Sequence, residues 1–177
     1  MRAKKWFLPV VALAVLTACG VPIQSGANFA SGWEPGRMAT FAWRDARDRI
    51  VGDSRLEGNE VFHQSLHEAV GWELSLRGMR YIETDPDLLI HHHLSLADHV
   101  METEVIDEAG VSSTESYVYE GGSLVVHIVD ARTGDDAWVA WAEASVQPAF
   151  RGPDAMRRWV YDVVGRMFDD WPVPPRN

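Results

Sequence analysis

The chain of 177 residues has a single cysteine, few basic side chains and no long apolar run. Cys19 cannot form a disulfide within the chain, so a domain of this size has to be stable without one. The 16 basic side chains against 26 acidic ones argue against nucleic-acid binding, which depends on basic surface patches. Neither a Gly-x-Ser-x-Gly nucleophile motif nor a Gly-x-x-x-x-Gly-Lys-Ser/Thr phosphate-binding loop occurs. These absences favour a protein that is not an enzyme and has no cofactor.

The main apolar run lies at the N-terminus and is too short to span a membrane comfortably. Trp6–Leu16 gives an apolar stretch of about eleven residues, whereas a membrane span needs about 20. The run follows a basic head formed by Arg2, Lys4 and Lys5 and precedes small residues. This layout is typical of a cleaved secretory signal, and we expect residues 1–18 to be a signal peptide.

The end of this segment, Leu16-Thr17-Ala18-Cys19, resembles the Leu-x-Ala/Gly-Cys box of bacterial lipoproteins. The resemblance implies cleavage before Cys19, a diacylglycerol on its sulfur and a fatty acyl group on its new amino group. Each buried CH₂ contributes about 0.8 kcal/mol, so three chains anchor a protein far more firmly than one. Gly20 in place of Asp favours, by resemblance to known sorting, the periplasmic side of the outer membrane. The alternative is an ordinary signal peptide with a chance cysteine, or an uncleaved anchor.

The remaining chain is strongly acidic. Three of the sixteen Lys and Arg residues lie within residues 1–18, which leaves 13 basic against 26 acidic side chains and a net charge of −13 with His neutral. Such a chain is not drawn to a lipid surface by its own charge, so the acyl chains have to anchor it. Residues 19–36 are rich in Gly, Ser and Pro, which predicts a lipidated flexible tether. Residues 37–175 are then expected to form a single domain.

Two helices frame this domain in the sequence. Alternating apolar residues in 37–43 predict a first strand. Asn59 can cap an amphipathic helix that runs to about residue 77, and Gly78 supplies its end. Pro153 suits the first position of a second amphipathic helix near the C-terminus.

Between the helices, apolar and polar residues alternate in several stretches. Residues 88–99, 124–129 and 138–146 each place apolar side chains on one face, as in a sheet with one solvated face. Gly121 and Gly122 are expected to break the chain between strands. Consecutive strands with short connections favour antiparallel pairing. The expected fold class is α+β: a two-layer domain whose mostly antiparallel sheet carries two amphipathic helices on one face.

Several motifs are similar to those of one family. Thr40-Phe41-Ala42-Trp43 matches its T-Y-A-W, Pro86-Asp87-Leu88-Leu89-Ile90 its P-D-L-L-V, and Gly122-Ser123-Leu124-Val125-Val126 its G-T-L-V-I. The chain thus resembles, over about residues 37–172, the bacterial lipoproteins that carry Domain of Unknown Function 4136. That family has no established activity, so the resemblance implies fold and location but no mechanism.

The outer face of the predicted sheet is the candidate binding surface. Trp141 falls on this face beside Val139, and Val125 and His127 fall on the same face of the preceding strand. Exposed aromatic and apolar side chains mark partner surfaces. We therefore expect a non-enzymatic module that binds another envelope protein or an apolar ligand, unless a helix or loop covers Trp141.

Three histidines offer an alternative function. His91 and His93 point to one side of their strand, and His127 lies on the non-core face of a neighbouring strand, so their imidazoles could converge on zinc or copper. No tight ligand spacing such as His-Glu-x-x-His accompanies them, and a merely solvated polar face explains them as well. The sequence therefore predicts no metal site, with these three residues as the candidates if one exists.

An unrecognised hydrolase is the remaining alternative. Asp85 and Asp87 bring two carboxylates close together around Pro86, and an acidic pocket there would favour catalysis. The same pattern before a strand is common in turns, where the proline restricts the backbone as the chain enters the strand.

Overall fold

The computed structural model describes residues 22–44, 50–51, 54–106 and 112–171. The predicted signal peptide, Cys19 and the last residues of the predicted domain, 172–175, lie outside the described residues. Within the described ranges, none of the helices has the length and apolar character needed to cross a membrane.

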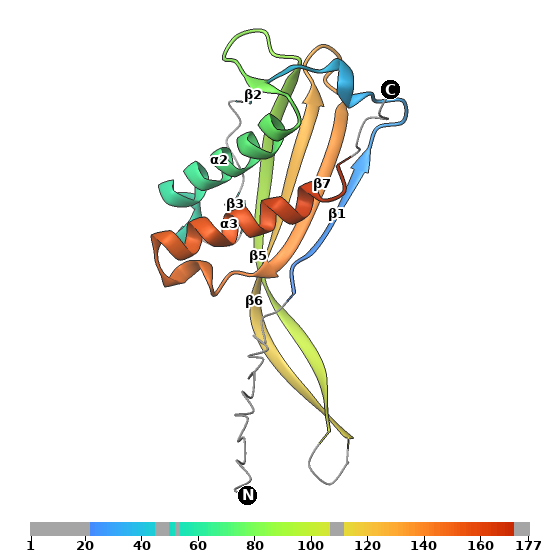
Figure 1. Cartoon of the computed structure of the whole chain (residues 1–177). Helices are drawn as coiled ribbons and strands as arrows, with labels where there is room; N and C mark the ends of the chain where they lie inside the picture. The colour runs from blue at the N-terminus through green and yellow to red at the C-terminus, as the bar shows by residue number, and fades with distance from the viewer. Residues whose placement is uncertain (1–21, 45–49, 52–53, 107–111, 172–177) are drawn as a thin grey trace, which may run out of the picture.

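One sheet and a layer of helices make up the fold (Figure 1). The strands are β1 (Gln24–Phe29), β2 (Thr40–Trp43), β3 (Ile50–Val51), β4 (Arg80–Tyr81), β5 (Leu88–Ile106), β6 (Ser112–Asp130) and β7 (Asp136–Ser145). The helices are α1 (Ser54–Glu57), α2 (Glu60–Leu76) and α3 (Pro153–Phe168), with short 3₁₀ turns at Pro35–Arg37 and Ala149–Arg151.

The strand order is β1-β7-β6-β5-β2-β4, and β3 pairs with β5 beside this path. Strands β5, β6, β7 and β1 pair antiparallel in succession. Strand β2 pairs parallel with β5 and with β4, and β3 pairs parallel with β5, so the sheet is mixed. The predicted α+β fold with two helices packed on a sheet is confirmed.

Both main helices begin where the sequence predicts, and α2 also ends there. The side chain of Asn59 accepts a hydrogen bond from the Phe62 backbone N–H at 3.0 Å and caps α2. Gly78 follows α2 with φ +85°, a left-handed conformation that favours glycine. Pro153 occupies the first turn of α3, where its missing N–H costs no hydrogen bond.

The core lies between the sheet and the helices. Trp138 of β7 is fully buried, and its ring centroid lies 4.7 Å from that of Phe168 and 5.0 Å from that of Trp171. Every second residue that follows Trp138 in β7 is a buried alanine: Ala140, Ala142 and Ala144. These small side chains let α3, which packs against α2 and β7, approach the sheet closely.

The prediction of a flexible tether over residues 19–36 is wrong for its described part. Residues Gln24–Phe29 form strand β1, which pairs antiparallel with β7 and extends the sheet by one strand. The ring of Trp33 then stacks on that of Phe29 with centroids 6.0 Å apart. Without β1, the edge of β7 would expose unpaired backbone N–H and C=O groups. Strand β1 forms hydrogen bonds with these groups, although its composition is typical of a linker.

The expected chain break at Gly121 and Gly122 is also wrong, because β6 runs straight through both. A Cβ at Gly122 would lie 2.7 Å from the Val146 side chain, and one at Gly121 would lie 2.5 Å from the His99 ring. The glycines therefore permit close packing across the strand rather than a turn. Beyond them, β5 and β6 continue as a two-stranded arm, residues 98–106 and 112–120, that projects past the helices (Figure 1).

Asp87 ties the start of β5 to β2. Its carboxylate Oδ2 accepts hydrogen bonds from the Ala39 N–H at 2.8 Å, the Thr40 N–H at 2.9 Å and the Thr40 hydroxyl at 2.8 Å. The bond from Ala39, with those from Thr40, lowers the pKa of Asp87 below its usual value. The carboxylate is thus held in its ionised, accepting form.

We expect Asp87→Asn to lower the free energy of unfolding by about 1 kcal/mol at pH 7, a value reduced for solvent screening. A depressed folded-state pKa contributes stability above the unfolded pKa, and this is lost as the pH falls through the folded pKa. The difference between the wild-type protein and the variant should therefore shrink below about pH 4. Urea unfolding at neutral and acidic pH measures it. Asp85→Asn is the control, since asparagine tolerates the positive φ of that residue; equal losses in both variants would contradict the assignment.

Candidate functional site

The helices cover one face of the sheet, and the other, which we call the helix-free face, carries the candidate residues. Along β7, alternate residues point away from the helices, and Val139 and Trp141 belong to this outward set. Val139 lies directly opposite His127 in the β6–β7 pairing, and Trp141 lies opposite Val125. The structure therefore brings together the four residues that the sequence assigned to one surface.

Two rows of cross-strand neighbours build this face. One row runs across β5, β6, β7 and β1 through His91, His127, Val139 and Asn28. The next row runs through His93, Val125, Trp141 and Gly26. Directly opposed residues have Cβ atoms about 4.5–5.5 Å apart, so the side chains within each row are neighbours up to Gly26, which has none.

Trp141 is the most prominent apolar group of the face, with 38 % of its surface exposed. No helix or loop of the described residues buries it, and Val125, His127 and Val139 around it are half-buried. The indole lies over Gly26 of β1, where an added Cβ would come within 3.0 Å of its Nε1 atom. Strand β1 therefore supports the indole from one side.

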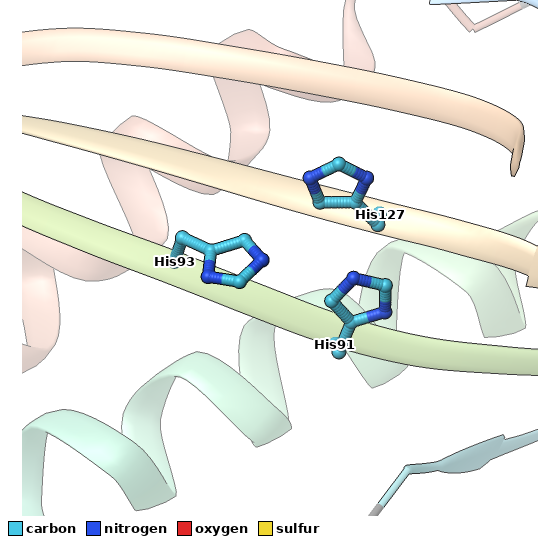
Figure 2. Close-up of side chains that lie close together, drawn as sticks. All are labelled: His91, His93 and His127. Carbon is cyan, nitrogen blue, oxygen red and sulfur yellow. The ribbon is translucent and has the colours of Figure 1, made fainter. Parts of the chain in front are cut away.

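The rings of His91, His93 and His127 meet on the helix-free face (Figure 2). The His91 and His127 rings stack with centroids 4.5 Å apart and an interplanar angle of 6°. The His93 ring stands nearly perpendicular to both, with centroids 5.4 Å from His91 and 5.3 Å from His127. One ring nitrogen of each residue lies within 4.8 Å of the other two. We call these three residues the histidine trio.

Charged and buried groups around the trio set its electrostatics. Nδ1 of His127 lies 3.1 Å from Oδ1 of Asp136. Because a carboxylate oxygen accepts, the His127 tautomer in this contact carries its hydrogen on Nδ1. Burial lowers the pKa of His91, and the neighbouring His127 and His93 lower it further, while Asp136 acts in the opposite direction. Nδ1 of His91 is buried and has no hydrogen-bond partner among the described residues. The His91 ring is therefore neutral near pH 7 and able to donate a nitrogen lone pair.

Three other polar residues make their contacts away from the trio. His99, which continues the row of His91 and His93 along β5, stacks on Tyr119 in the arm instead. Glu143 accepts a hydrogen bond from the Ser123 hydroxyl at 3.3 Å. Asp87 uses its carboxylate to join two strands, as described above.

A second group of histidines lies on the helix-covered face. His92 is buried between β5 and α2, beside the rings of Trp43, Phe62 and His67, and burial lowers its pKa to about 3. The His67 ring stacks on Trp43 with centroids 3.9 Å apart. His92 is thus a neutral core residue, as the alternation of its strand predicts.

Sequence reasoning missed two residues of the site. They are Asp136, the first residue of β7, and Arg44, whose backbone N–H donates to the Ile90 carbonyl at 2.8 Å. The positive charge of Arg44 contributes to the lowered pKa of His91, so it lies near the trio. The available sequence signal for Asp136 was its position at the expected start of a strand, across the hairpin from His127.

Comparisons with known proteins cover almost the whole described chain. A family model described as Domain of unknown function (DUF4136) matches residues 25–173. This match includes all of β1 except Gln24, in agreement with the place of that strand in the sheet. No curated protein matches the chain.

Some solved structures are similar to this chain. A PDZ domain protein from Parabacteroides distasonis is similar with a TM-score of 0.55 and 15 % identity, over 89 % of this chain and 38 % of that one. This chain therefore spans about 38 % of that protein's length, and the likeness shows the fold alone. A PelC dodecamer from Paraburkholderia phytofirmans has a TM-score of 0.46 and 6 % identity, over 83 % of this chain and 96 % of that one. A homolog of neuraminyllactose-binding hemagglutinin from Helicobacter pylori has a TM-score of 0.46 and 13 % identity, over 79 % and 89 %.

The contact between β1 and Trp141 can be tested with one methyl group. We expect Gly26→Ala to shift the indole N–H resonance of Trp141, because the new Cβ lies 3.0–3.1 Å from that ring and the ring has to move. A heteronuclear NMR spectrum measures the shift, with the Trp141 signal identified by its loss in Trp141→Phe. Gly36→Ala is the control, since nothing lies within 4 Å of that position. An unchanged Trp141 signal in Gly26→Ala would refute the packing of β1 under the indole.

Proposed function

The chain belongs to the family described as Domain of unknown function (DUF4136), and from this premise we propose that it is a non-enzymatic binding module of the cell envelope. In this proposal, acyl chains on Cys19 anchor it to the periplasmic face of the outer membrane. The helix-free face, centred on Trp141, binds another envelope protein. The observation that carries the proposal is the exposed indole on a sheet face that no described helix covers.

The position of the first strand supports the anchoring. Strand β1 starts at Gln24, five residues after Cys19, and five residues span at most about 18 Å. Gln24 pairs with Glu143, close to the point where Ser145 pairs with Gly121 and the arm begins. A lipid anchor on Cys19 would therefore hold the arm end of the sheet near the membrane surface.

The composition of the helix-free face supports protein binding. An aromatic ring with two valines beside it, bordered by polar side chains, matches the centre and rim of a protein interface. Tryptophan is also among the residues that contribute most to binding energy in such interfaces. The Trp141 indole is already oriented by Gly26 and β1, so little side-chain freedom would be lost on binding.

Anchoring is tested at Cys19. We expect the mature protein to begin at Cys19 with a thioether-linked diacylglycerol and an acylated amino group, and to fractionate with the outer membrane. Cys19→Ser removes the acceptor sulfur and should take the protein out of that fraction, whereas Thr17→Ser, at the variable position of the box, should change nothing. Mass spectrometry of the N-terminal peptide decides the matter. A different first residue or an unmodified thiol contradicts the proposal.

The binding surface is tested by comparing two exposed tryptophans. Trp141→Ala should weaken capture of the envelope partner by about 30-fold if Trp141 contributes about 2 kcal/mol. Trp72→Ala is the matched control, because Trp72 is 58 % exposed and lies on α2, in the other layer. Quantitative mass spectrometry of material captured from envelope extracts measures the effect.

Val139→Asp provides a second variant of the same surface that leaves the indole in place. It should weaken capture as Trp141→Ala does, because it buries a charge in the contact. Equal capture by the wild-type protein and both variants, with circular dichroism showing intact folds, would exclude this face as the interface.

A further inference from the structure

We propose that His91, His93 and His127 bind one divalent transition-metal ion of the zinc and copper class on the helix-free face. Each residue would contribute one ring nitrogen, and solvent or a partner group would complete the coordination. The inference stands apart from the proposed lipid anchor and protein partner, because it depends on the geometry of the trio alone.

The donor nitrogens already lie close to the spacing that a metal ion requires. In a tetrahedral zinc site with Zn–N bonds of about 2.1 Å, two ligand nitrogens are roughly 3.4 Å apart. One nitrogen of each trio residue lies within 4.8 Å of the other two. Because the His91 and His127 rings are stacked and nearly parallel, both have to turn about their side-chain bonds before their lone pairs can point at one ion. The three rings lie close together on this face (Figure 2).

The trio lies on hydrogen-bonded strands in the middle of the sheet. His91 and His127 are direct partners in the antiparallel pairing of β5 and β6, and His93 follows two residues along β5 on the same face. Both strands lie in the middle of the sheet, with β7 on one side and β2 on the other. Ligands on paired central strands keep their relative positions, which lowers the entropy that metal binding has to overcome.

Asp136 gives the trio a feature of genuine metal sites. It accepts a hydrogen bond from Nδ1 of His127, which fixes the tautomer with the lone pair on Nε2. Metal-bound histidines commonly donate their second ring N–H to a carboxylate, which orients the ring and makes the ligand nitrogen more basic. Asp136 is thus a positioning residue for His127 rather than a ligand.

The chemistry of the donors selects the metal. Neutral imidazoles suit zinc, copper and nickel, whereas magnesium and calcium prefer carboxylate and carbonyl oxygens. His93 is exposed, so the trio faces solvent on one side and leaves at least one coordination position accessible. Among the described residues, the trio is the group of His, Cys, Asp or Glu side chains close enough to hold an ion.

The experiment is a titration of the full chain, purified in detergent and stripped with a chelator, with Zn²⁺ alone. Calorimetry should show one equivalent bound, and each of His91→Gln, His93→Gln and His127→Gln should weaken binding by at least about tenfold. Asp136→Asn should weaken it by about 10- to 100-fold through the orientation of His127. His99→Gln is the matched control, since His99 lies on the same strand and stacks on Tyr119 away from the trio, and it should bind zinc like the wild-type protein.

NMR of the imidazole nitrogens keeps the test independent of variant folding. Addition of one equivalent of Zn²⁺ should shift the ring nitrogen signals of His91, His93 and His127 and leave those of His99 and His92 in place. The proposal is overturned if zinc binds only in large excess over the protein, if the His99→Gln loss equals that of the trio variants, or if other histidines shift instead. These outcomes leave the capture experiment on Trp141 unaffected.

Discussion

The register in which β5 pairs with β6 is the constraint on which the rest of the structure depends. The two strands of nineteen residues pair along their whole length, from Leu88 opposite Asp130 to Ile106 opposite Ser112. Side chains of a strand alternate between faces, so a slip of one residue would exchange the buried and the exposed sets. Burial of the pairs Ile90–Ile128 and Leu94–Leu124 against the helices fixes the register. The contact of His91 with His127 is a consequence of that hydrophobic burial.

The parts of the fold that follow local rules could be predicted from the sequence, and the parts that depend on distant partners could not. Asn59 and Pro153 mark their helices because capping and proline geometry act within a few residues. Strand β1 is held by backbone bonds to β7, more than a hundred residues away, and its own composition is that of a linker. Two consecutive glycines, Gly121 and Gly122, suggest a turn in the sequence. The reason for glycine at these positions is crowding by His99 and Val146, which is visible only in three dimensions.

The same distinction applies to the site. Period-two alternation placed His91, His93 and His127 on the open face, but which residues touch depends on the register, which the sequence does not encode locally. Asp136 was missed for a specific reason. The β6–β7 pairing shifts register between Ile128 and Val129, so Trp138 faces Ile128 while Asp136 faces Val129. This irregularity takes Asp136 out of the strict alternation that begins at Trp138 and lets its carboxylate reach His127.

The run His91-His92-His93 shows how one strand separates stability from surface chemistry. His92 points into the core, where burial holds its pKa at about 3, so it adds no charge to the helix-covered face at neutral pH. Its two neighbours point the opposite way and contribute polar nitrogens to the open face. A ligand, proton or partner that binds to His91 and His93 therefore contacts side chains that are not part of the hydrophobic core. The helix-free face can change its chemistry without loss of the fold, because the residues that bury apolar surface and those that present donors alternate along the same backbone.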